Sequence, residues 1–312
     1  MSATILERPA QPATDHSPTP SPARESSPEP TCTTAVLTVS CPQRPGITQA
    51  ITTFLYERGF DIREHQQFDD RRSERFFLRT AFSTGAPIDI EALRRDFTPI
   101  AEEFGMDADF HDERPPRLLV MVSKFGHCLN DLLFRWRGGT LGGEIALVVS
   151  NHEDLRPMVE AAGLPFVHVP VTKDTKAEAE AKLLELVDTH DIDLVVLARY
   201  MQILSDDLCH ALAGRAINIH HSFLPGFKGA RPYHQAYERG VKLVGATAHY
   251  VTADLDEGPI IEQEINRVDH TYTPEALTVV GRDAECLALA RAVRWHCEHR
   301  ILLHGSSTVV FR

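Results

Sequence analysis

The pattern of apolar and polar residues predicts helices and strands along the chain, and the order of these elements changes near residue 115. Before that point, two segments, residues 47–55 and 93–104, carry apolar residues on one face of a helix. In the first of them the apolar positions follow the series i, i+3, i+4, i+7 and i+8. Gly59 and Gly105 are placed to end these two helices.

Four short stretches around these helices read as strands. They are residues 35–40, 61–68, 75–82 and 106–111. The order strand, helix, two strands, helix, strand predicts a ferredoxin-like βαββαβ domain, which we place at residues 32–113.

Arg114, Pro115 and Pro116 form a short stiff linker, and the pattern beyond it changes to apolar strands that alternate with amphipathic helices. The first of these strands carries almost no polar residue, as expected where both faces of a sheet are covered. We expect strands at 118–122, 145–149, 166–171, 193–198, 216–219 and 245–251, and helices at 126–137 and 176–189. This alternation predicts an α/β domain with a doubly wound, mostly parallel sheet at residues 117–312.

The last helix has a recognisable start, because Thr273 is a favourable N-cap and Pro274 fits the first helical position. We expect it to continue to about residue 303, with a final strand at 305–311. Residues 1–31 are rich in Pro, Ser, Thr and Glu and lack apolar periodicity, so we expect a disordered tail.

The formal net charge of −12 argues against non-specific binding to nucleic acid or to an anionic membrane. No apolar run approaches the ~20 residues that a membrane helix needs, and the N-terminus lacks a signal-peptide pattern, so we expect a cytoplasmic protein. The six cysteines form no CxxC pair, and no HExxH motif occurs among the 16 histidines. We therefore expect reduced thiols and no metal site.

Candidate chemistry gathers between residues 217 and 262. Asn218 and His220 are two apart on an extended segment, so their side chains point the same way. An amide can hold a carbonyl oxygen, and an imidazolium can stabilise the charge that develops on it. Asp256, in the loop LDEGP, can aim a carboxylate at His220 or at an attacking water. Since ligands sit beyond the carboxyl ends of the strands in such sheets, we expect these side chains to meet at one edge.

The order NIHHSFLP, then HYV and TADLDEGP, resembles the folate-dependent formyltransferase family. The resemblance implies that Asn218, His220 and Asp256 act on the formyl group of 10-formyltetrahydrofolate. The segment ARYMQIL resembles the pterin-pocket segment of that family, and TADLD would form the opposite wall. The residues so implied to bind the substrate are Met201, Gln202, Ile203, Leu204, Thr252, Ala253 and Asp254.

Other segments indicate which group within this family the chain resembles. The turn in VSKFGHCLNDLLF has one glycine, where glycinamide ribonucleotide formyltransferases carry a Gly- and Ser-rich phosphate loop. Together with HHSFLPGFKGARPYHQAYERGVKLVGATAHYV and the N-terminal unit, it resembles the formyltetrahydrofolate deformylase family over about residues 34–312. The resemblance implies hydrolysis of 10-formyltetrahydrofolate to formate and tetrahydrofolate, which feeds one-carbon and purine metabolism and needs no cofactor. His127 and Cys128 would shape the place where an amine substrate otherwise enters, and we expect the Cys128 thiol to pack rather than to attack.

The N-terminal unit resembles an ACT domain, most specifically at CPQRPGI, its first strand-to-helix turn. In that family the turn binds small amino acids, which implies an effector site at Pro45, Gly46 and Ile47. A dimerisation module without a ligand is an equal alternative. ACT-like sheets often pair side by side, so we expect a homo-oligomer.

Three other functions stay open on the sequence. One is transfer of the formyl group to an amine acceptor, and formate release without an acceptor would argue against it. A second is an amino-acid or folate sensor with an inactive catalytic domain, which detectable turnover would exclude. A metal-dependent hydrolase is the third, and activity in a chelator would remove it.

Overall fold

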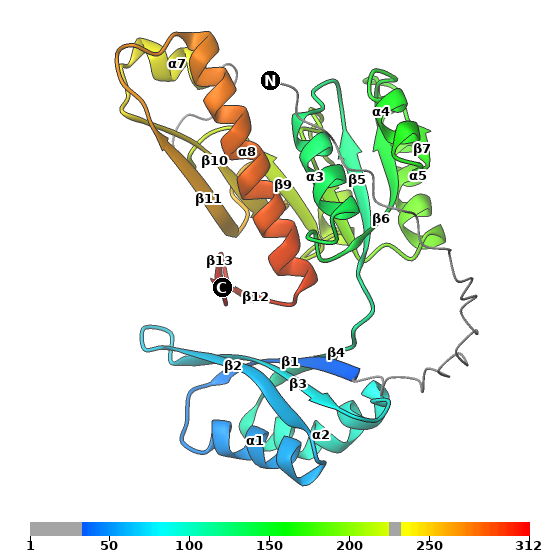
Figure 1. Ribbon diagram of the computed structural model, residues 1–312, viewed down its shortest axis with the longest axis vertical. Coiled ribbons are helices and arrows are strands. Elements are labelled where there is room, and N and C mark those ends of the chain that lie inside the picture. The colour runs from blue at the N-terminus through cyan, green and yellow to red at the C-terminus, as the bar shows by residue number, and fades with distance from the viewer. Residues whose placement is uncertain (1–32, 225–231) are drawn as a thin grey trace, which may run out of the picture.

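The computed structural model describes residues 33–224 and 232–312. The tail expected at residues 1–31 lies outside these ranges. The described chain forms two α/β units, each around its own hydrophobic cluster, and a two-stranded hairpin near the C-terminus (Figure 1). No helix in the described part combines the length and the apolar character that a membrane crossing needs.

The first unit is an antiparallel sheet with two helices on one face (Figure 1). It runs β1 (Thr33–Pro42), α1 (Ile47–Glu57), β2 (Asp61–Asp70), β3 (Arg75–Thr84), α2 (Ile90–Phe104) and β4 (Asp107–His111). The sheet order is β2-β3-β1-β4. This is the ferredoxin-like βαββαβ arrangement that the sequence predicted, and it is consistent with an ACT-like domain.

Local sequence fixes the ends of these two helices. Gly46, which precedes α1, has φ 97°, a left-handed conformation that glycine adopts without steric cost. Asp89 caps α2 by accepting a hydrogen bond from the Ala92 N–H, and Gly105 ends it at φ 62°.

The second unit is a seven-stranded sheet of order β11-β10-β9-β8-β5-β6-β7. Its elements are β5 (Arg117–Val122), α3 (His127–Arg137), β6 (Glu144–Ser150), α4 (Arg156–Ala161), β7 (Phe166–His168), α5 (Lys176–Thr189), β8 (Leu194–Leu197), α6 (Asp206–Ala211), β9 (Ala216–His220), α7 (Pro232–Glu238), β10 (Leu243–Tyr250), β11 (Ile260–Arg267) and α8 (Pro274–Cys297). Strands β5 to β9 pair in parallel, whereas β10 pairs antiparallel with both of its neighbours. The predicted doubly wound, mostly parallel sheet is confirmed, and the predicted linker falls between β4 and β5.

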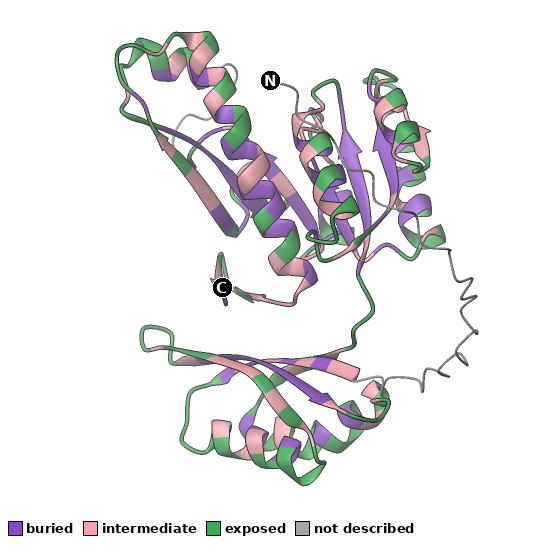
Figure 2. Cartoon of the chain, viewed as in Figure 1, coloured by how far each residue is buried: buried purple, intermediate pink, exposed green. Residues whose placement is uncertain are grey.

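Both faces of this sheet are covered, which explains its apolar strands. Leu118 and Val120 of β5 belong to the hydrophobic cluster that includes side chains of α3, α4 and α8. Leu119 and Met121, which point the other way, belong to the cluster of α5 and α6. Figure 2 shows the buried residues concentrated on the strands and on the inner sides of the helices.

Two predicted element bounds are wrong. The last helix ends at Cys297 rather than near residue 303, and β12 (Ile301–His304) pairs with β13 (Ser307–Val310) as a hairpin. The helix ends before His299, which has φ 53°, and the Glu298 carbonyl at this end accepts hydrogen bonds from Arg79 of the first unit at 3.1 and 2.9 Å. Strand β7 covers 166–168 instead of 166–171.

The two units meet at the hairpin. Phe77 of β3 is fully buried and packs with Leu302 and Phe311. Arg300 pairs with Glu64 of β2 at 3.0 Å. The face of the first sheet that carries no helix therefore packs against the segment that follows α8. Helix α8 itself packs against the second sheet.

Candidate active site

One cavity of about 330 Å³ lies beside the ends of β8 and β9, under the connection between β10 and β11. Among its lining residues are Met201, Gln202, Ile203, Leu204, Asn218, His220, Thr252, Ala253, Asp254 and Asp256. The structure therefore brings together the three residues predicted to react and the two segments predicted to form the walls. Their roles in binding and catalysis stay predictions.

Asp256 reaches the cavity by a route that the sequence analysis did not foresee. Because β10 is antiparallel to β9, its carboxyl end lies at the opposite edge of the sheet from that of β9. Residues 251–258 therefore fold back to bring Asp256 to His220, and Asp256 itself has φ 59°. Gly258 permits the turn, because a Cβ there would lie 1.7 Å from the Tyr250 carbonyl oxygen. We expected the carboxyl ends of the three strands to lie at one edge of the sheet, and this is wrong for β10. The side chains of Asn218, His220 and Asp256 nevertheless lie in one cavity.

The amide of Asn218 is oriented by a buried histidine. His249 Nδ1 lies 2.9 Å from the Tyr250 carbonyl oxygen, which can only accept, so Nδ1 carries the proton. Burial lowers the pKa of His249 and keeps the ring neutral, which leaves Nε2 as an acceptor. The Asn218 Nδ2 group donates to that atom at 3.2 Å. Among the described residues its second N–H has no partner, and Asn218 lines the cavity, so this N–H is available to a ligand there.

His220 is hydrogen-bonded to Asp256. Its Nδ1 lies 3.2 Å from Oδ1 of Asp256, and its Nε2 lies 2.9 Å from the Ser222 hydroxyl. The hydrogen bond from His220 lowers the pKa of the Asp256 carboxyl, so the carboxylate is ionised at neutral pH. A carboxylate in this position holds the imidazole in one orientation.

Arg199 and His221 also line the cavity, and the sequence analysis assigned neither of them to the site. The His221 ring lies beside that of His220, with centroids 5.1 Å apart. Burial, with a contribution from the Arg199 guanidinium, lowers the pKa of His221 to about 4, so this ring is neutral at pH 7. Arg199 offered no signal in the sequence, because its position depends on a left-handed backbone turn after β8.

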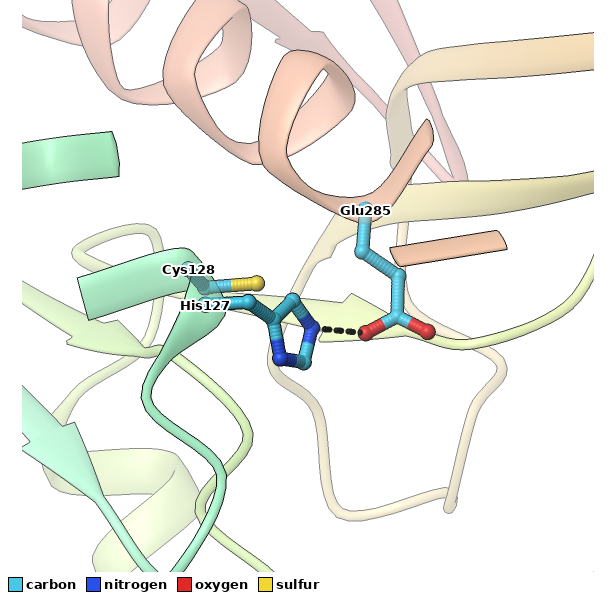
Figure 3. Close-up of side chains that lie close together, drawn as sticks. All are labelled: His127, Cys128 and Glu285. Carbon is cyan, nitrogen blue, oxygen red and sulfur yellow. Dashed lines mark hydrogen bonds and ion pairs between the residues drawn. The ribbon is translucent and has the colours of Figure 1, made fainter. Parts of the chain in front are cut away.

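His127 and Cys128 do not line the cavity; they lie behind it at the start of α3. His127 Nε2 is 2.7 Å from Oε2 of Glu285, a carboxylate of α8 that is 1% exposed (Figure 3). Cys128 is fully buried, and the hydrogen bond with Cys286 together with burial raises the pKa of its thiol. The expected packing role of Cys128 agrees with its position, and the predicted part of His127 and Cys128 in shaping the substrate site stays a prediction.

His127, Cys128 and Glu285 also form the one group among the described residues whose donor atoms could hold a metal ion, since these atoms lie within 4.8 Å of one another. The carboxylate oxygens already have partners. Oε1 accepts from the Tyr233 hydroxyl at 2.9 Å, and Oε2 lies 3.4 Å from Nε of Arg199. A guanidinium at this distance supplies the positive charge that a cation would bring, so the cluster fits a metal poorly.

The predicted effector residues lie at the first turn of the first unit. Gly46 lines an open groove of about 530 Å³ between α1 and α2, and Arg58 and Phe104 line the same groove. Ile47 is buried, and neither it nor Pro45 lines this groove. Effector binding stays a prediction.

Comparison with known proteins places this geometry in a family. Residues 116–293 match the family model of the formyl transferases. The formyltetrahydrofolate deformylase of Corynebacterium sp. (strain P-1) is 55% identical over 279 residues, which are 89% of this chain and 98% of that protein.

Solved structures agree over both units. The crystal structure of formyltetrahydrofolate deformylase from Burkholderia mallei has 54% identity and a TM-score of 0.85, and the match covers 90% of this chain and all of that one. A glycinamide ribonucleotide transformylase from Symbiobacterium toebii matches with 32% identity and a TM-score of 0.60, over 64% of this chain and 95% of that one. The likeness to deformylases thus spans more of the chain than the likeness to this transformylase. The chain belongs to the formyltetrahydrofolate deformylase family.

Proposed function

We propose that the cavity between residues 197–204 and the 251–258 connection is where the chain hydrolyses 10-formyltetrahydrofolate to formate and tetrahydrofolate, with Asn218, His220 and Asp256 as the reacting set. The reaction is that of the family to which the chain belongs. The observation that carries the assignment of the site is the 3.2 Å pair of His220 with Asp256, next to an oriented Asn218 amide in one cavity.

The roles follow from the chemistry of a formyl amide. The free N–H of Asn218 holds the formyl oxygen, and protonated His220 stabilises the negative charge that this oxygen gains when water attacks. Asp256 orients His220 and takes the proton of the attacking water through bound solvent. When the tetrahedral intermediate collapses, the C–N bond breaks, the departing nitrogen receives that proton, and formate leaves.

The two walls suit a flat aromatic substrate. Met201 and Ile203 are 51% and 62% exposed, although both are apolar, and they stand at the cavity together with Leu255. Apolar side chains that remain exposed beside polar reacting groups are typical of a ligand site. We assign them to the pterin of the folate, with Thr252, Ala253 and Asp254 opposite.

The test is formate release from 10-formyltetrahydrofolate in buffer without any amine. We expect formate and tetrahydrofolate in equal amounts. If 10-formyltetrahydrofolate loses its formyl group only when an amine is added, the result would instead favour a transferase. Binding of folate without turnover would favour a sensor. The same assay in a chelator tests the prediction that no metal takes part.

We also propose that a small amino acid, with glycine and methionine as first candidates, binds near Gly46 and changes this rate. Gly46 and Gly59 both have left-handed φ, of 97° and 74°, but only Gly46 lines the groove. We therefore expect Gly46→Ala to weaken the response to the effector and Gly59→Ala to preserve it. No response of the wild type to any amino acid would leave a purely structural unit. The homo-oligomer and the cytoplasmic location expected from the sequence stay predictions.

A further inference from the structure

Arg199 occupies a position that is unfavourable for most residues. It follows β8 with φ 65°, in the left-handed region, which a non-glycine residue adopts only where the surroundings hold it there. Its side chain is 11% exposed and lines the cavity of the proposed reaction. A strained backbone that carries a charged group into a reaction cavity indicates a role for that group.

A buried set of side chains anchors the guanidinium from behind. Arg199 Nε lies 3.4 Å from Oε2 of Glu285, and Glu285 is held in turn by His127 at 2.7 Å and by Tyr233 at 2.9 Å. On another side the guanidinium carbon lies 5.7 Å from the centre of the Phe125 ring. Glu285 comes from the middle of α8, so the anchor is part of the core (Figure 3).

The other end of the guanidinium has no such anchor. Among the described residues, neither Nη group of Arg199 has a hydrogen-bond partner, while Nε is held by its ion pair with Glu285 at 3.4 Å and not by a hydrogen bond. The two Nη groups form a planar fork of donors, which matches the two oxygens of a carboxylate. An anchored guanidinium with a free fork in a cavity is a site for a small carboxylate.

We propose that Arg199 binds formate as it forms, and that Glu285, with His127 and Tyr233, positions the guanidinium for this. Hydrolysis adds the oxygen of water to the formyl carbon as the C–N bond breaks, and the carbon keeps its own oxygen, so the product formate carries both. Transfer to an amine never places two oxygens on that carbon. A fork that recognises the oxygen pair therefore favours hydrolysis over transfer. This inference rests on the reaction proposed above.

The pair Arg199→Lys and Arg282→Met tests the inference. The guanidinium carbons of Arg199 and Arg282 both lie 5.7 Å from the centre of the Phe125 ring, but only Arg199 lines the cavity, so Arg282→Met is a matched control. Lysine keeps the charge opposite Glu285 and loses the fork. The measurement is binding of ¹³C-formate to the folate-free protein, followed by line broadening of the formate signal.

We expect Arg199→Lys to weaken formate binding at least about tenfold, which is about 1.4 kcal/mol, and Arg282→Met to leave it unchanged. Formate should also inhibit the wild type as a product, and this inhibition should weaken in parallel. Equal formate binding in wild type and in a folded Arg199→Lys protein would overturn the proposal and leave Arg199 a structural partner of Glu285. Because binding is measured without folate, this result is separate from a failure of the wild type to release formate, which would instead contradict the proposed function.

Glu285→Gln tests the positioning role. Glutamine keeps the size of the side chain and can accept from one of Tyr233 and His127 through its single oxygen, but it no longer carries the charge that holds Arg199. We expect formate binding to fall in this variant while the KM for 10-formyltetrahydrofolate changes less than kcat. A variant whose stability falls while formate binding and the kcat-to-KM pattern stay as in wild type would assign Glu285 a structural role only.

Discussion

His249 Nε2 lies 3.2 Å from Nδ2 of Asn218, on the neighbouring strand and directly opposite in register. With Nδ1 fixed on the Tyr250 carbonyl, the imidazole accepts one amide hydrogen of Asn218 and so decides which way the amide faces. Without this contact the amide can rotate and present its oxygen to the substrate oxygen, which is repulsive. The histidine thus acts on the reaction through Asn218.

We therefore expect His249→Leu to lower kcat about tenfold or more, because a misplaced oxyanion donor typically costs 10²–10³ and only part of the orientation is lost. KM should change less, since the walls of the cavity are untouched. The measurement is steady-state formate release, with His270→Leu on the exposed surface as control. Wild-type kcat in His249→Leu would mean that Asn218 is oriented by other means.

Asp256→Asn removes the charge opposite His220 and keeps the size of the side chain. We expect formate release to fall by about 10²–10⁴, the range for loss of a general acid–base group, with folate binding largely kept. Turnover is followed as formate release, and folate binding by direct titration of the variant. Near-normal turnover in Asp256→Asn would exclude the assigned role.

The sequence predicted most of the fold, because helix periodicity and apolar strands are local signals. The helix predicted at 176–189 has those bounds as α5. The predictions that failed concern features that depend on contacts between segments distant in the sequence. The Glu298 carbonyl at the end of α8 accepts a hydrogen bond from Arg79 of the other unit, and the approach of Asp256 depends on the antiparallel pairing of β10. Arg199 was missed because no motif signals a left-handed residue other than glycine.

Gly281 allows Tyr233 to reach Glu285. A Cβ at Gly281 would lie 2.0 Å from the Tyr233 hydroxyl oxygen, so Gly281→Ala must displace this ring. We expect a loss of about 1–3 kcal/mol in the free energy of unfolding, as for other overpacked sites, and weaker anchoring of Glu285. Gly85→Ala is the control, since no atom lies within 4 Å of a Cβ there. Denaturant unfolding of both variants measures the difference, and equal stability would contradict the predicted clash.

Cys128 packs in the core and is not expected to take part in the reaction. Cys128→Ala should retain turnover within about twofold, while stability falls by about 0.5–3 kcal/mol, as for typical core substitutions. The measurement is formate release at saturating substrate, beside thermal unfolding. Lost turnover in a folded variant would assign the thiol a chemical role after all.

Stability should fall in mild acid because histidines are buried in neutral form where the two units meet. His111 of β4 stacks on His299 after α8, with ring centroids 3.7 Å apart and planes 8° apart. Burial, with the neighbouring His111, lowers the pKa of His299 to about 3, and burial also lowers the pKa of His111. An unfolded histidine titrates near 6.5. Between the two values the unfolded chain binds the proton and the folded chain does not.

The free energy of unfolding should therefore decrease as the pH falls from about 6.5 toward 4, by up to about 1.4 kcal/mol per pH unit for each such histidine. His299→Phe keeps a ring for the stack and removes one proton site, so the decrease should become shallower by up to that amount. His270→Phe, on an exposed histidine, is the matched control and should leave the slope unchanged. The slopes come from urea unfolding at several pH values. A histidine that releases its proton on folding contributes to the slope, and its replacement by Phe removes this contribution. If His299→Phe has the same slope as wild type, the acid sensitivity therefore does not originate at this stack.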